Sequence, residues 1–258
     1  MIKFNSKLKI LLDVYFERYN QPDFITDDPI QVPHSFSKKE DIEIAAFFTC
    51  IMAWGKRKQI INNAYKLMAI MNNSPFDYIM SFNNEMLQQL SNFKHRTING
   101  NDIVNLVLAL KHIYKNQGGL ESFFTQEFKK NNNLFDSLTL LYDFVLNYTQ
   151  DRHTTKHISN VKNNSAAKKL NLFLRWMVRK DANGVDFGLW QNIPISSLYI
   201  PLDVHVSEMA RHLGLLTRMQ NDWKAVVELT QNLRQFDQND PIKYDYALFG
   251  MGLERFKI

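Results

Sequence analysis

The chain has 258 residues, of which 45% are hydrophobic, and a formal net charge of +5. This length suits one large domain or two smaller ones that share a cleft, and the hydrophobic fraction allows a sizeable core. The single cysteine, Cys50, excludes a disulfide framework, a cysteine-based zinc site and a cysteine-ligated iron–sulfur cluster. We therefore expect no cofactor and no bound metal.

The N-terminal run MIKFNSKLKILLDVYFERY contains Asp13, Glu17 and Arg18, and no small-residue cleavage site follows it. These charges indicate an amphipathic helix rather than a signal peptide. No stretch of the chain reaches the roughly 18 uncharged apolar residues of a membrane span. We expect a cytoplasmic protein without a membrane partner.

Helical patterns then follow one another along the chain, after a linking segment at 22–41 that is rich in Pro and Asp. An irregular segment, 181–201, interrupts them. Because no alternating strand pattern occurs, the sequence predicts an all-α chain of roughly ten or more helices. The predicted helical stretches are 40–54, 55–71, 74–82, 101–116, 119–130, 134–148, 166–180, 204–213, 221–236 and 240–256.

Positive charge is concentrated in residues 151–180, which hold eight lysines and arginines and one acid, Asp151. The rest of the chain has a slight excess of acids. A basic patch on a near-neutral body is typical of proteins that bind a phosphate backbone. The alternative is a solvated helix face and loop.

Within this stretch, the helical periodicity of 163–178 places Lys168, Arg175 and Arg179 on one side and apolar residues on the other. We expect this basic side to be solvated. Lys168 lies in the first turn, where the helix dipole and the adjacent Lys169 disfavour an ammonium. A neutral lysine is a nucleophile that forms Schiff bases, and the same helix start offers backbone N–H groups to a phosphate.

The stretch YIPLDVHVSEMARHLGL (199–215) places Asp203 where an apolar approach turns into a helical pattern. Asp203 is either a helix cap or a catalytic carboxylate, and the pattern alone leaves both interpretations open. His205, two residues on, is either a packing residue or a proton shuttle that supports catalysis.

Three stretches together resemble the helix-hairpin-helix DNA glycosylase superfamily. Residues 45–68 resemble its early helix pair, and 164–178 resemble the end of the hairpin and the helix that follows, with Lys168 at the position of the catalytic lysine. Residues 200–215 resemble the segment that carries the catalytic aspartate, with Asp203 at that position.

A second resemblance is narrower. Residues 93–124, 170–190 and 201–218 are similar to an uncharacterised bacterial family known only as a domain of unknown function. This similarity covers nearly the whole chain, whereas the remote resemblance to the glycosylases is the one that implies a function.

The glycosylase resemblance implies two helical subdomains that flank a cleft. One would combine residues 1–35 with 195–258, and the other would be a central bundle of residues 36–194. It also implies a DNA repair enzyme that flips a damaged base out of double-stranded DNA. Lys168 would attack the sugar and form a Schiff base, Asp203 would stabilise the developing positive charge, and strand cleavage by β-elimination would follow.

Two departures from the superfamily bear on this expectation. The hairpin equivalent, VKNNSAAKK, has no glycine, although Asn163 and Asn164 tolerate a positive φ better than most residues. Thirty-five residues separate Lys168 from Asp203, an interval that resembles the archaeal 8-oxoguanine glycosylases and points to an oxidised purine as substrate.

The remaining candidates are contacts to nucleic acid and a base pocket, with a solvated face and core packing as their alternatives. The candidate nucleic-acid contacts are Lys56, Arg57, Arg96, Lys162, Asn163, Asn164, Ser165, Lys169 and Arg175. The candidate pocket residues are Trp54, Asp186, Phe187 and Trp190. Two other functions stay open, namely a non-catalytic binder of DNA or structured RNA, and a helical enzyme or scaffold without a nucleic-acid role.

Overall fold

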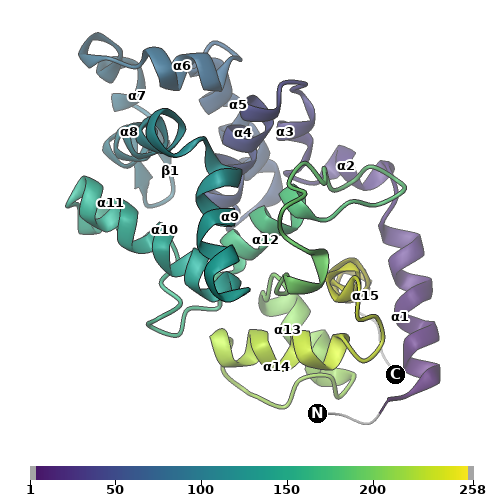
Figure 1. Cartoon of the computed structure of the whole chain (residues 1–258). Helices are drawn as coiled ribbons and strands as arrows, with labels where there is room; N and C mark the ends of the chain where they lie inside the picture. The colour runs from purple at the N-terminus through teal and green to yellow at the C-terminus, as the bar shows by residue number, and fades with distance from the viewer. Residues whose placement is uncertain (1–3, 255–258) are drawn as a thin grey trace. The chain divides into compact units, whose positions relative to one another are not determined.

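The computed structural model describes residues 4–254, and this part of the chain is predominantly helical, which confirms the predicted all-α class (Figure 1). The α-helices are α1 (Ser6–Tyr19), α2 (Asp23–Asp27), α3 (Gln31–His34), α4 (Lys39–Ile51), α5 (Arg57–Ile70), α6 (Pro75–Ser81), α7 (Leu87–Ser91), α8 (Gly100–Gln117), α9 (Leu120–Asn131), α10 (Leu134–Thr149), α11 (Arg152–Thr155), α12 (Lys168–Val178), α13 (Val204–His212), α14 (Trp223–Leu233) and α15 (Tyr244–Leu253). Short 3-10 helices are η1 (Asn84–Met86), η2 (Ile195–Ser197) and η3 (Pro241–Lys243).

A small hairpin, β1 (Lys94–His95) and β2 (Ile98–Asn99), is a feature that the sequence did not predict. His95 pairs with Ile98, so Arg96 and Thr97 form a two-residue turn. Arg96 has φ +56°, the left-handed conformation that such tight turns need. The strands are too short for an alternating pattern to reveal them.

The described chain divides into two compact units. One combines residues 4–24 with 161–254, and the other comprises residues 25–160. The predicted subdomain limits, 35/36 and 194/195, stay a prediction. None of the helices in residues 4–254 is long and apolar enough to cross a membrane.

In the discontinuous unit, α1 runs along α15, and α15 also packs on α13 (Figure 1). The contact between α1 and α15 depends on Gly250, because a Cβ there would lie 2.2 Å from the ring of Tyr19. Helix α12 is the core helix of this unit, with most of its side chains buried. Its buried residues are Leu170, Asn171, Phe173, Leu174, Arg175, Trp176, Met177 and Val178.

In the unit of residues 25–160, α8 begins with a capping box. The side chain of Asn99 accepts from the backbone N–H of Asp102, and the carboxylate of Asp102 accepts from the N–H of Asn99. Gly100 follows the cap and has no room for a side chain, because a Cβ would lie 2.3 Å from the carbonyl oxygen of Leu90. These local constraints fix the position of Asp102 in the first turn.

Candidate functional site

The turn before α12 is held by the start of α14. Asn164 has φ +63°, and its side-chain amide donates to Asp222 Oδ2 at 2.8 Å. The backbone N–H of Trp223 donates to the carbonyl oxygen of Asn164 at 3.1 Å. Asp222 is itself the N-cap of α14 and pairs with Arg218, whose hydrogen bond lowers the pKa of the Asp222 carboxyl. A carboxylate that favours its charged form therefore anchors this turn.

Helix α12 begins at Lys168, directly after Ala167, so Lys168 lies in the first turn as predicted, although the predicted helix begins two residues earlier, at 166. Ala167 has φ +48° and no side chain that could accept from the first-turn amides. The side-chain amide of Asn171 donates back to the carbonyl oxygen of Ala166 at 3.2 Å, which fixes the entry of the chain into the helix. Lys168 thus starts the helix from a constrained position, with its side chain 35% exposed.

Asp203 is a helix cap, and it also faces Lys168. Its Oδ1 accepts from the backbone N–H of Val206 at 2.8 Å, so the cap interpretation is confirmed. Its Oδ2 lies 3.4 Å from Nζ of Lys168. The two candidate catalytic side chains are therefore brought together within one unit, and the carboxylate is fixed in place by the helix that it caps.

A buried acid that the sequence did not single out lies behind this pair. Asp245 of α15 is almost fully buried and contacts the guanidinium of Arg175, which also reaches Asp186 through Nε at 3.2 Å. Burial raises the pKa of Asp245 to about 7; Arg175 opposes the rise, and the charge of Asp203 adds to it. The negative charge of Asp203 thus contributes to the raised pKa of Asp245.

The predicted solvated stripe on α12 is wrong for Arg175 and Arg179, which are 3% and 1% exposed. Arg179 pairs with acids from two segments that fold over this side of the helix. Its partners are Asp181, Asp186 and Asp240. A helical wheel cannot show which side a distant segment covers, and a buried, ion-paired Arg175 is not positioned to contact a phosphate.

The candidate pocket residues fall in both units, and within each unit they have structural partners. Asp186 is a buried partner of both arginines, and Trp190 is a core residue whose ring meets that of Phe173 edge-on at 5.4 Å. Phe187 is half-buried in the same segment, bonded through its N–H to the carbonyl of Trp176. Trp54 belongs to the other unit, where Arg96 covers its ring at 3.9 Å.

The remaining candidate contacts differ in their exposure. Lys162 and Asn163 are exposed and Lys169 is half-buried, whereas Ser165 forms a β-bridge with Asp222 and is part of the anchored turn. In the unit of residues 25–160, Lys56 is exposed, Arg57 is half-buried, and Arg96 is committed to the Trp54 ring. His205 is exposed on the first turn of α13.

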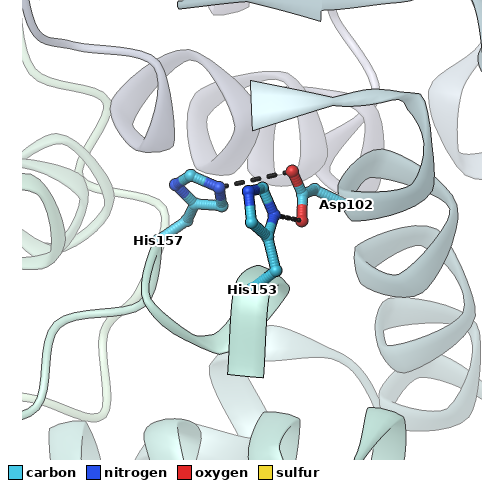
Figure 2. A group of neighbouring side chains, drawn as sticks. All are labelled: Asp102, His153 and His157. Carbon is cyan, nitrogen blue, oxygen red and sulfur yellow. Dashed lines mark hydrogen bonds and ion pairs between the residues drawn. The ribbon is translucent and has the colours of Figure 1, made fainter. Parts of the chain in front are cut away.

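A second cluster was missed altogether. Asp102, His153 and His157 come together in the unit of residues 25–160 (Figure 2). The spacing of the two histidines was visible in the sequence, but the acid precedes His153 by 51 residues. No local pattern joins them. Likewise, the signal for Asp245 was only an acid inside the otherwise apolar run YDYALFGMGL.

Comparison with protein families matches residues 28–254 to the family described as "Protein of unknown function (DUF2400)". The chain belongs to this family, which agrees with the narrower of the two resemblances noted in the sequence. No curated protein and no solved structure matches the chain.

Proposed function

We propose that the chain is a DNA glycosylase with lyase activity, in which Lys168 is the nucleophile and Asp203 the assisting carboxylate. The observation that carries the proposal is the 3.4 Å distance between Lys168 Nζ and Asp203 Oδ2. Both groups stand at helix starts, and both are partly exposed, at 35% and 20% of their side-chain surface. A partly exposed pair of this kind contributes little to stability, so the fold does not depend on Lys168 keeping its charge.

The proposed reaction begins with a flipped nucleotide. A proton passes from the ammonium of Lys168 to the carboxylate of Asp203, which leaves a neutral amine. The lone pair of Nζ attacks C1′ of the deoxyribose, the bond from C1′ to the base breaks, and the base departs with that electron pair and takes up the proton held by Asp203. Asp203, which is then a carboxylate again, stabilises the positive charge on the sugar.

The lyase step follows from the same amine. Opening of the bond between C1′ and O4′ gives an imine between C1′ and Nζ, with O4′ protonated. Loss of a proton from C2′ then expels the 3′-phosphate, and hydrolysis of the imine frees Lys168. This sequence needs neither a redox step nor an external reductant.

The proposed substrate is duplex DNA that carries an oxidised purine. The support for this choice is the thirty-five-residue interval between Lys168 and Asp203, which resembles the archaeal 8-oxoguanine glycosylases. The exposed Lys162 just before the anchored turn, and Lys169 beside the nucleophile, offer positive charge for the phosphate backbone.

Borohydride trapping tests the proposal. End-labelled duplexes with 8-oxoguanine, uracil or an abasic site are incubated with the wild type, Lys168→Gln and Lys169→Gln. The expected result is a covalent adduct that is lost in Lys168→Gln and kept in Lys169→Gln, the matched control on the same turn. An adduct that survives in Lys168→Gln, or no adduct on any duplex, would contradict the proposal.

One observation favours a second candidate, a non-catalytic binder of DNA or structured RNA. The turn before α12 has no glycine, and the amide of Asn164 is engaged with Asp222. This candidate predicts binding that is unchanged in Lys168→Ala and Asp203→Ala. It also predicts that binding falls when Arg152, Lys156 and Lys162 are all replaced by glutamate, with a reduced dependence on salt.

A further inference from the structure

The carboxylate of Asp102 is fully buried and makes more contacts than a helix cap requires. As a member of the capping box it accepts from the backbone N–H of Asn99, at 2.9 Å from Oδ2. Its other oxygen, Oδ1, accepts from the hydroxyl of Thr154 at 3.0 Å. The cap and this hydroxyl account for Asp102 as a structural residue, but they do not explain why two imidazoles converge on it.

The two histidines reach Asp102 from a single short segment. His153 lies in α11, and its Nδ1 is 2.7 Å from Asp102 Oδ1. His157 follows that helix, and its Nε2 is 3.3 Å from Asp102 Oδ2. Figure 2 shows both rings directed at the same carboxylate, one on each oxygen. The three ligand atoms all lie within 4.8 Å of one another.

The distance between His157 and Asp102 suits a tetrahedral metal ion. With bonds of about 2.0–2.1 Å, two ligands of a tetrahedral zinc are about 3.3 Å apart. The contact between His157 and Asp102 already has this length, at 3.3 Å. The contact between His153 and Asp102, at 2.7 Å, would lengthen as an ion replaced the hydrogen that the two atoms now share.

Charge supports the same conclusion. A buried carboxylate needs a positive partner, and within residues 4–254 the ion pairs of Asp102 are with the two histidines, not with a lysine or arginine. The side chain of His153 is 44% exposed, whereas that of His157 is 4% exposed. An ion could therefore enter from the His153 side, and water could occupy a fourth position there.

We propose that Asp102, His153 and His157 form a binding site for one divalent transition-metal ion, with zinc as the fitting example. Two imidazole nitrogens and one carboxylate oxygen favour zinc and its neighbours over magnesium and calcium, which prefer all-oxygen sites. The proposal differs from the expectation that the chain binds no metal. It is also independent of the proposed glycosylase chemistry, because all three ligands lie in the unit of residues 25–160, whereas Lys168 and Asp203 lie in the other unit.

The test measures zinc binding to the full chain after removal of metal, by competition with a chromophoric chelator. The wild type should bind one equivalent. His153→Gln should bind at least about tenfold more weakly, because loss of a direct ligand costs no less than loss of a group that merely orients one. His212→Gln, an exposed histidine in α13, is the matched control and should bind like the wild type.

A second measurement uses the wild type alone and so does not depend on how a variant folds. Long-range ¹⁵N spectra of the imidazoles should show shifts at Nδ1 of His153 and Nε2 of His157 on addition of one equivalent of zinc. The absence of stoichiometric zinc binding would overturn the proposal. So would equal affinity in His153→Gln, or shifts confined to other histidines.

Discussion

Both ends of α12 carry positively charged side chains, but these differ in their exposure and in their acidic partners. At the N-terminal end, Lys168 is partly exposed and has one carboxylate, Asp203, at 3.4 Å. Toward the C-terminal end, Arg175 and Arg179 are buried among four carboxylates. Breaking the ion pair of Lys168 should therefore cost little free energy, whereas breaking those of the buried arginines should cost much more. The difference shows that the fold depends less on Lys168 than on the two arginines, which is compatible with the chemistry proposed for Lys168.

The largest expected effect comes from removing a buried cation. Arg175→Ala should lower the free energy of unfolding by about 3–5 kcal/mol, because Asp186 and Asp245 would lose a buried partner. Urea unfolding measures this difference. A loss below about 1 kcal/mol, the range of exposed ion pairs, would show that the two ends of the helix do not differ.

The next effect is a pH dependence at the buried end. Because the pKa of Asp245 is raised to about 7 in the folded protein, the folded state keeps a proton that the unfolded chain releases from about pH 4 upward. The stability that this group contributes is complete below that pH and is lost as the pH rises through 7.

Asp245→Asn removes this titration. The difference in unfolding free energy between the variant and the wild type should therefore shift in favour of the variant from pH 4 to pH 7.5. Urea unfolding at a series of pH values in this range measures the difference. A difference that stays constant across the range would contradict the raised pKa.

Substitutions of Asp203 should separate its two roles, as the cap of α13 and as the charge that faces Lys168. Asp203→Ala should destabilise the protein by about 1 kcal/mol, because α13 loses its cap. Asp203→Asn should keep most of that stability, because asparagine is also a good cap, yet lose the charge that faces Lys168. Thermal unfolding and the trapping assay together separate the roles, and equal adduct yields from the wild type and Asp203→Asn would argue against a catalytic carboxylate.

The smallest effect on stability is expected at the nucleophile. Lys168→Gln should change the free energy of unfolding by less than about 1 kcal/mol, since a partly exposed ion pair contributes little. If Lys168→Gln proved as damaging as Arg175→Ala in urea unfolding, Lys168 would be a structural cation like those at the other end.

The sequence predicted those features of the fold that depend on residues close together in the chain, such as helices and their caps. Periodicity predicted a helix with Lys168 in its first turn, and the cap pattern placed Asp203 before α13; both signals span a few residues. The catalytic roles of these two residues stay a prediction.

What the sequence could not predict depends on distant segments. The burial of Arg175 is caused by acids in 181–186 and in α15, and Asp102 meets His153 only through the fold of its unit. The periodicity of one helix contains no information about either partner.

The division of the chain also has a consequence for folding during synthesis. Residues 25–160 form a contiguous unit, so all of its internal contacts become available before the second half of the other unit has been translated. The discontinuous unit must wait for α15, because Arg175 needs Asp245 and α1 needs Gly250. Until then Arg175 lacks Asp245, one of its acidic partners, and α1 is uncovered. Pausing or truncation before residue 244 should therefore expose the cell to an aggregation-prone intermediate in which the other unit is already complete.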